Sequence, residues 1–174
     1  MKKMFLISLL QLFVLSVFGQ LPVRNDAWDL TLPQGTQPLS REEYDRISKE
    51  SLDSKYVDTK IPFSFYQKDR MFFLLARLND LMFPRKLETK QKIHNYNLSH
   101  LDNVTLLESN IVNKHGNDFL IIHSVKFGDH ELSFYSRTNS KLGYMHGRLI
   151  FKASDEADAK QYLDQVLANF VLKE

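Results

Sequence analysis

The sequence predicts an α+β fold, in which an antiparallel β-sheet meander is flanked by helices and a long C-terminal helix packs on the sheet. Two observations support this prediction. Between residues 104 and 152, four segments rich in apolar side chains follow one another with only short polar turns between them. The next segment has apolar side chains at steps of three and four residues, the spacing of a helix with one buried face.

The first nineteen residues have the pattern of a secretory signal peptide. Lys2 and Lys3 precede an apolar run of about fifteen residues, and Gly19 lies at its end. We predict cleavage after Gly19, so that Gln20 becomes the first residue. A membrane anchor is the alternative, but a spanning helix needs about twenty apolar residues, and this run contains Gln11. No later segment approaches that length, so we expect no membrane span after cleavage.

Removal of the leader leaves about 155 residues, enough for one domain. We expect that domain over residues 28–174, preceded by a short tether over residues 20–27.

The whole chain has 23 Lys and Arg against 21 Asp and Glu, and the leader removes two Lys and no acid. A neutral body of this kind argues against nucleic-acid binding, which requires a strongly positive face. The chain has no Cys, which excludes disulfides, thiolate catalysis and Cys-ligated metals.

The N-terminal part of the domain predicts a strand and then a helix. Residues 28–32 alternate between apolar and polar side chains, as in a half-buried strand. Ser40 and Glu43 have the spacing of a capping box, which satisfies unpaired backbone N–H groups where a helix begins. We therefore predict a helix over residues 41–52.

The middle of the chain predicts two strands and a short helix. Residues 61–66 form the first strand, and Pro62 indicates that it begins at the edge of a sheet. The apolar run over residues 71–78 predicts the second strand because of its length and the turn before it, with a helix as the alternative. After the break at Pro84, residues 87–101 predict a short helix.

The meander and the last helix follow. The four strands are expected over residues 104–112, 119–127, 131–137 and 143–152. Gly128 and Asp129 form the tight hairpin between the second and third strands. The closing helix is expected to begin at an N-cap, Ser154. Its buried stripe comprises Ala159, Tyr162, Leu163, Val166, Leu167 and Phe170.

The predicted elements follow one another in a characteristic order. A strand that ends in Leu32-Pro33-x-Gly35 precedes a helix and further strands. The chain then closes with the strand Tyr144-Met145-His146-Gly147-Arg148-Leu149-Ile150-Phe151 and a helix over residues 157–170. This order resembles the Mog1/PsbP-like fold over most of the chain after the leader. The resemblance implies a central antiparallel sheet packed between helices and a binding or assembly role without shared catalysis. It carries over no functional residue position by position. A small barrel plugged by the last helix, as in pleckstrin-homology-like domains, is the alternative fold.

The six histidines form no metal-binding motif in the sequence. His123 and His146 lie on predicted strands and His130 lies at a hairpin, so strand pairing can bring two of them within reach of each other. A metal would then need a third ligand, for which Glu131 or Asp129 is available. We favour exposed or backbone-bonded histidines, and predict no metal site and no cofactor.

Other catalytic patterns are missing from the sequence. No serine lies in a G-x-S-x-G nucleophile motif, and no phosphate-binding loop is present. Gly147 within the last strand favours a bulge or a close approach of another group to the backbone. Core packing, rather than a pocket for an apolar ligand, is expected for Phe63, Phe65, Phe72 and Phe73.

We therefore predict an exported, non-catalytic binding or assembly protein of the bacterial cell envelope, periplasmic or secreted, with a protein partner. Its contacts are expected on loops and on the exposed sheet face. Tyr and Arg are enriched at binding hot spots. The candidate binding residues are Tyr135, Arg137, Tyr144, His146 and Arg148. The alternative for these side chains is that they only coat a solvent-exposed sheet face.

Two other functions remain open from the sequence. The first is an immunity protein, an exported partner that neutralises a toxin delivered to the envelope by a rival cell. The second is a hydrolase with a cryptic site, in which His123 or His146 lies beside an acidic residue in a polar cleft.

Overall fold

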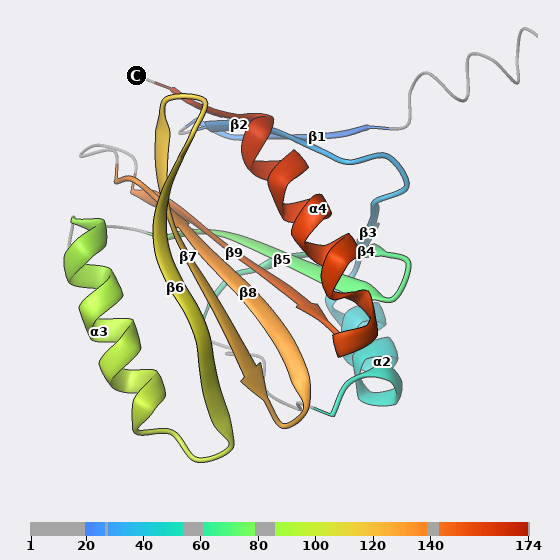
Figure 1. Ribbon diagram of the computed structural model, residues 1–174. Helices are drawn as coiled ribbons and strands as arrows, with labels where there is room; N and C mark the ends of the chain where they lie inside the picture. Colours follow the sequence, from blue (N-terminus) through green and yellow to red (C-terminus); the bar gives the residue numbers. More distant parts are fainter. Residues whose placement is uncertain (1–19, 27, 54–60, 79–85, 139–142, 174) are drawn as a thin grey trace, which may run out of the picture.

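The computed structural model describes residues 20–26, 28–53, 61–78, 86–138 and 143–173 (Figure 1). The predicted signal peptide, residues 1–19, lies outside these ranges, so its cleavage stays a prediction. Within the same ranges, no helix is both long and apolar enough to cross a membrane.

The main sheet has seven strands, and each is antiparallel to its neighbours. In spatial order they are β3 (Gln37–Leu39), β4 (Ser64–Lys68), β5 (Met71–Leu78), β9 (Tyr144–Phe151), β8 (Asp129–Ser136), β7 (Asn117–Lys126) and β6 (Val104–Lys114). The predicted meander is confirmed as β6 to β9. Among the described strands the sheet is open, with β3 and β6 at its edges, so the barrel alternative is wrong.

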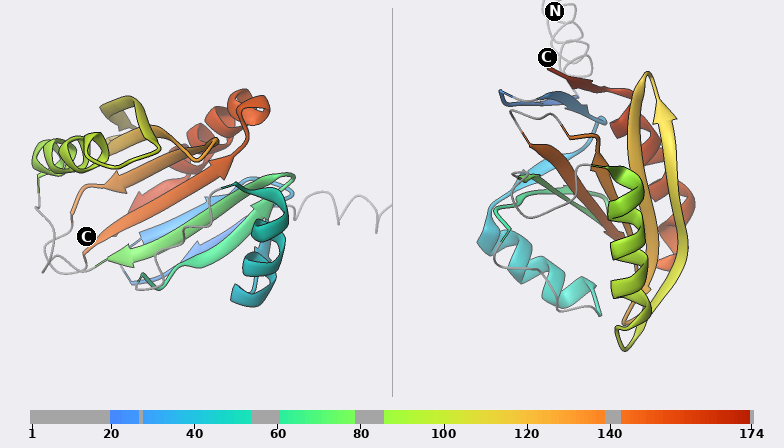
Figure 2. Two further views of the ribbon diagram at one scale, coloured as in Figure 1. Left: turned by 90° about the horizontal axis from the view of Figure 1, so that it is seen from below. Right: turned by 90° about the vertical axis from the view of Figure 1, so that its left-hand side faces the viewer.

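Helices cover both faces of this sheet (Figure 2). The C-terminal helix α4 (Glu156–Ala168) packs on one face. The helices α2 (Arg41–Ser51) and α3 (Leu87–Ser99) pack on the opposite face. The predicted α+β architecture, with a long terminal helix on the sheet, is therefore confirmed.

A second sheet joins the two ends of the described chain. It has three antiparallel strands, β1 (Leu21–Arg24), β2 (Trp28–Leu32) and β10 (Phe170–Leu172). The tether expected before residue 28 is wrong, because residues 21–24 pair with β2 and Leu21 packs against the core. Phe170 was expected on the last helix, but it begins β10 and pairs with Leu30.

The helix caps show one confirmed and one wrong prediction. Ser40 and Glu43 form the expected capping box at the start of α2. At α4, however, a 3-10 turn, η2 (Ala153–Asp155), precedes the helix. Ser154 lies inside this turn, and the cap position falls to Asp155, whose side chain makes no capping hydrogen bond.

The core contains the residues expected from the apolar pattern. Ala159, Tyr162, Leu163, Val166 and Leu167 of α4 are all buried against the sheet. The four phenylalanines of the middle segment are buried too, as predicted: Phe63, Phe65, Phe72 and Phe73.

Gly147 lies where the core is tightest. A Cβ atom at this position would lie 2.1 Å from the ring of Phe134, so the expected close approach is confirmed. Only glycine lets the Phe134 ring pack directly on the backbone of β9.

Candidate functional site

Four of the five candidate binding residues gather on the sheet face opposite α4. Tyr135 pairs with His146, and Ser133 with Arg148, across β8 and β9. Tyr144 shares this face with His146 and Arg148 because side chains alternate along a strand. The expected exposure is wrong, since these four candidates are at most 7% exposed. The helix α3 and residues preceding β4 cover them.

We call these four residues, together with their neighbours Glu131 and Ser133, the buried polar cluster. Its members are Glu131, Ser133, Tyr135, Tyr144, His146 and Arg148.

An ion pair lies at the centre of the buried polar cluster. Arg148 donates from Nε to Glu131 Oε1 at 2.9 Å and from Nη2 to Oε2 at 2.5 Å. Ser133 donates a further hydrogen bond to Glu131 Oε1 at 2.5 Å. Burial alone would raise the pKa of Glu131, but the Arg148 charge and these hydrogen bonds outweigh burial and lower that pKa to about 2. Both groups are therefore charged, and each neutralises the other.

A column of stacked rings extends beside this ion pair. The Tyr135 ring lies 4.3 Å from the His146 ring, at an interplanar angle of 8°. The His94 ring of α3 lies 4.7 Å from the Tyr135 ring, tilted by 31°, and Phe63 meets the His146 ring edge-on at 5.5 Å. The column links α3 to β8, β9 and the residues before β4, so these aromatic contacts fix the cover to the sheet.

His146 is enclosed and uncharged. Burial and the neighbouring Arg148 charge lower its pKa to about 3. Neither ring nitrogen has a hydrogen-bond partner among the described residues. An imidazole in this state packs as an aromatic ring and does not take up a proton at neutral pH.

Lys90 enters the same region from α3. Its side chain is 1% exposed, and its Nζ lies 3.2 Å from the centroid of the Tyr144 ring. The Nζ also donates to Thr138 Oγ1 at 3.5 Å. A desolvated ammonium over an aromatic face is a favourable cation–π contact, and it ties the first turn of α3 to β9.

Arg137 is the one candidate that the fold separates from the others. It follows β8, is exposed, and lines an open hollow of about 690 Å³ at the N-terminal end of α3. The other residues that line this hollow are Lys86, Leu87, Glu88, Ile111, Asp118 and Thr138. Both signs of charge and two apolar side chains, Leu87 and Ile111, therefore meet at this open hollow.

Sequence reasoning missed several members of this region. Glu131 and Ser133 share a face with Tyr135 through the two-residue period of β8, a signal that was available in the sequence. Lys90 and His94 share a face of α3 through their four-residue spacing. The sequence held no signal that this helix face would cover β8 and β9.

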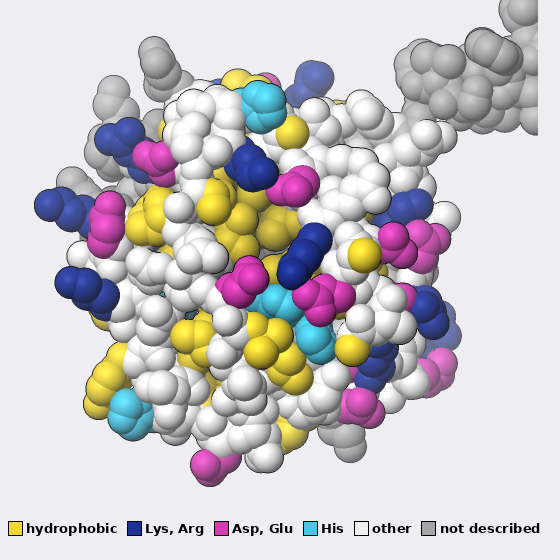
Figure 3. All heavy atoms as spheres, viewed as in Figure 1, with side chains coloured by type: hydrophobic (Ala, Val, Ile, Leu, Met, Phe, Trp, Pro, Cys, Tyr) yellow, Lys and Arg dark blue, Asp and Glu magenta, His cyan; other side chains and the backbone are white. Residues whose placement is uncertain are grey.

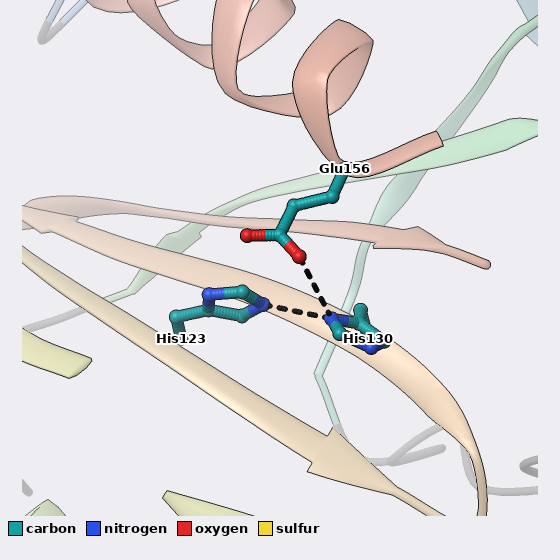
Figure 4. Close-up of side chains that lie close together, drawn as sticks. All are labelled: His123, His130 and Glu156. Carbon is teal, nitrogen blue, oxygen red and sulfur yellow. Dashed lines mark hydrogen bonds and ion pairs between the residues drawn. The ribbon is translucent and has the colours of Figure 1, made fainter. Parts of the chain in front are cut away.

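A second cluster of titratable side chains lies on the α4 side of the sheet (Figure 4). His123 Nε2 lies 3.0 Å from His130 Nδ1, and His130 Nδ1 lies 3.8 Å from Glu156 Oε2. Strand pairing does bring two histidines together, as the sequence allowed. The carboxylate beside them is Glu156, whereas Glu131 points to the opposite face and pairs with Arg148.

The hydrolase alternative required His123 or His146 in a polar cleft beside an acid. The His146 ring is enclosed by Phe63 and Tyr135 and stays neutral. His123 lies near Glu156 but is 1% exposed. The hollow beside Arg137 and a second one of about 600 Å³ between Pro33 and α4 are lined by other residues. None of these observations favours the hydrolase.

Neither a known family profile nor a curated protein matches this sequence. Solved structures do match. The cyanobacterial PsbP protein of Synechocystis (CyanoP) has a TM-score of 0.57 and 10% identity, and the match covers 89% of this chain and 93% of that one. LpqN of Mycobacterium tuberculosis, described as involved in cell envelope biogenesis, has a TM-score of 0.50 and 11% identity, covering 89% and 91%.

The Ran-binding protein Mog1p of Saccharomyces cerevisiae also matches, with a TM-score of 0.50, 12% identity, and coverage of 88% of this chain and 95% of that one. At these identities the likeness shows the fold alone. The chain has a Mog1/PsbP-like fold, as its element order predicted.

Proposed function

We propose that this chain is an exported, non-catalytic protein of the bacterial cell envelope, periplasmic or secreted, that acts by binding a protein partner. The single observation that supports this proposal most is that four of the five candidate residues are buried and one is exposed. Tyr135, Tyr144, His146 and Arg148 are occupied by contacts inside the fold. Arg137 alone is exposed, at the rim of an open hollow.

The composition of the hollow suits a protein surface. Lys86 and Arg137 are balanced by Glu88 and Asp118, and Ile111 is 36% exposed among them. A mixed rim around an apolar side chain is typical of protein interfaces, whereas a nucleic acid requires a surplus of positive charge.

Further exposed apolar side chains lie on the elements that border the hollow. Tyr96 on α3 is 66% exposed and Leu107 on β6 is 47% exposed. The strand β6 is also an edge of the main sheet, and edge strands offer backbone N–H and C=O groups to other chains. Among proteins of the same fold, LpqN is described as involved in cell envelope biogenesis and Mog1p as Ran-binding, which agrees with a binding role in the envelope.

A photo-crosslinking experiment tests the binding surface. Benzoylphenylalanine replaces Ile111 in the full chain, and a matched variant carries it at Val171 of β10, which is 59% exposed in the other sheet. We expect a discrete protein adduct from position 111 and none from position 171. Arg137→Glu should reduce that adduct at least about tenfold, the effect of removing a hot-spot arginine. Equal adducts at both positions would reject this surface.

Mass spectrometry of the adduct separates two versions of the proposal. A resident envelope component indicates an assembly role, and a toxin from a rival cell indicates immunity. Export is tested independently by the intact mass of the protein from fractionated cells. A chain that begins at Gln20 in the periplasm or medium supports export, and soluble cytosolic chains that retain Met1 overturn it.

A further inference from the structure

Three elements place His123, His130 and Glu156 together, independently of the binding surface above. The turn between β7 and β8 has two residues with positive φ, Phe127 at 53° and Gly128 at 91°, so the chain reverses tightly. His123 pairs with Leu132 across this hairpin, which makes His130 its diagonal neighbour on the same face. Glu156 is the first residue of α4, and its side chain points towards the two histidines from the helix side of the sheet (Figure 4).

The distances between the three groups are close to those of a metal site. One ligand atom from each residue lies within 4.8 Å of the other two. Zinc bonds of about 2.05 Å in a tetrahedral arrangement separate two ligand atoms by about 3.3 Å. The His123–His130 separation of 3.0 Å and the His130–Glu156 separation of 3.8 Å lie on either side of that value. Because the Glu156 side chain is 36% exposed, a small side-chain rotation suffices to close the site.

The types of side chain suit a cation. An imidazole nitrogen and a carboxylate oxygen are both common ligands of Zn²⁺. Two imidazoles and one carboxylate form a ligand set found in zinc proteins.

The surrounding contacts orient the three ligands. Lys160 Nζ binds Glu156 Oε1 at 2.7 Å, which leaves Oε2 facing His130. The ring of Phe151 packs against His123 and His130, at centroid distances of 6.0 and 5.5 Å. Such outer contacts fix ligand orientation in metal sites.

The site has an open side. Glu108 on β6 pairs in register with His123 on the same sheet face and is exposed, so its carboxylate can supply a fourth ligand, directly or through water. Figure 3 shows histidine side chains at the surface beside acidic and basic ones on this face of the molecule. A cation can therefore reach His130 and Glu156 from solvent, because their side chains are 14% and 36% exposed, while His123 itself is buried.

We propose that His123, His130 and Glu156 bind a divalent transition-metal ion, with Zn²⁺ as the ion that this ligand set fits best. The bound ion would fasten the β7–β8 hairpin to the first turn of α4. Three protein ligands also leave one coordination position for Glu108 or a water molecule.

Binding is measured on the mature chain by calorimetric titration with Zn²⁺. Co²⁺ serves as a second probe, because it occupies similar sites and absorbs visible light. We expect one Zn²⁺ per chain, a Co²⁺ absorption band that Zn²⁺ abolishes, and a Tm about 5–10 °C higher with Zn²⁺ at a hundred times its Kd. His130→Ala and Glu156→Gln should each weaken Zn²⁺ binding more than about 100-fold, beyond the usual effect of an outer contact.

The matched control is His115→Asn, which removes an exposed histidine from a turn with φ of 50°, a conformation that asparagine tolerates. This variant should bind Zn²⁺ like the wild type. Circular dichroism verifies that each variant is folded, and Glu156→Gln keeps the shape of its side chain if His130→Ala unfolds. Zn²⁺ binding that is absent in the wild type, or equal in wild type and Glu156→Gln, overturns the proposal.

Discussion

Glu131 and Arg148 are diagonal neighbours across β8 and β9 and form a two-pronged ion pair on the sheet face opposite α4. Arg148 Nε lies 2.9 Å from Glu131 Oε1. The Glu131 side chain is only 15% exposed and the Arg148 side chain only 9% exposed. A buried pair of this kind contributes little net stability against an apolar pair of similar volume, but removal of one partner leaves a buried charge without compensation.

Glu131→Gln should therefore lower the free energy of unfolding by about 3–5 kcal/mol. The guanidinium of Arg148 would keep its charge in this variant, because an arginine side chain is not deprotonated in proteins. Urea unfolding followed by circular dichroism measures the loss. The double variant Glu131→Leu with Arg148→Met is the control, and it should be more stable than Glu131→Gln. A double variant less stable than the single one would contradict this account.

The same pair predicts acid sensitivity. The pKa of Glu131 falls from 4.5 to about 2 on folding. The unfolded chain therefore binds more protons between these values, and the stabilisation is complete above pH 4.5 and is lost as the pH falls towards 2. The loss amounts to roughly 3 kcal/mol. Unfolding free energies measured at several pH values should show this slope in the wild type, and the Glu131→Leu with Arg148→Met variant should lack that contribution.

His146→Phe should stabilise the protein by about 1–2 kcal/mol at pH 7, because it removes two buried nitrogens that have no partner among the described residues. Phenylalanine can keep the stack on Tyr135. The pKa of His146 is lowered to about 3, so the unfolded state takes up a proton between pH 6.5 and 3 while the folded state does not. Stability due to this group is complete above pH 6.5 and is lost as the pH falls, and the variant should lose less over that window.

Thermal unfolding of both proteins across that pH range tests the role of His146. A variant that is less stable at pH 7 and keeps the wild-type pH slope would show that the imidazole has a polar partner in the folded protein.

Gly147→Ala should destabilise the fold by about 3 kcal/mol, because its methyl group would overlap the Phe134 ring. Gly116→Ala is the matched control. No atom of the described residues lies within 4 Å of its added Cβ, but its φ of 82° is unfavourable for alanine, so we expect a cost of only about 1 kcal/mol. Chemical denaturation of both variants separates overlap from backbone strain. Phe134→Leu added to Gly147→Ala should restore part of the lost stability, and no recovery would count against a steric cause.

Much of the secondary structure could be read from local patterns. The capping box of Ser40 and Glu43 fixes the start of α2, because both groups act within one turn. The apolar stripe from Ala159 to Leu167 predicts the buried face of α4, because helix periodicity is a property of neighbouring residues. The turn residues between β6 and β9 predict the meander for the same reason.

The candidate site was only partly accessible to such reasoning. Alternation along β8 and β9 could place Tyr135 and His146 on one face. It could not show that this face is covered, because the covering residues, such as His94, come from a separate helix. For that reason, the expectation that the candidate side chains are exposed was wrong for four of them. Arg137 is exposed because β8 ends at Ser136, one residue before it.

What the sequence by itself determined is therefore the type and order of most elements and the residues that face the core, since these follow from spacing within a segment. Only the tertiary structure decided that Phe170 closes a second sheet with β2, that α3 packs against Tyr135 and Tyr144, and that Glu156 meets His123 and His130. These relationships depend on how elements that are distant in the sequence pack together. That packing is set by the complementarity of whole surfaces, which the spacing of apolar residues within one segment does not reveal.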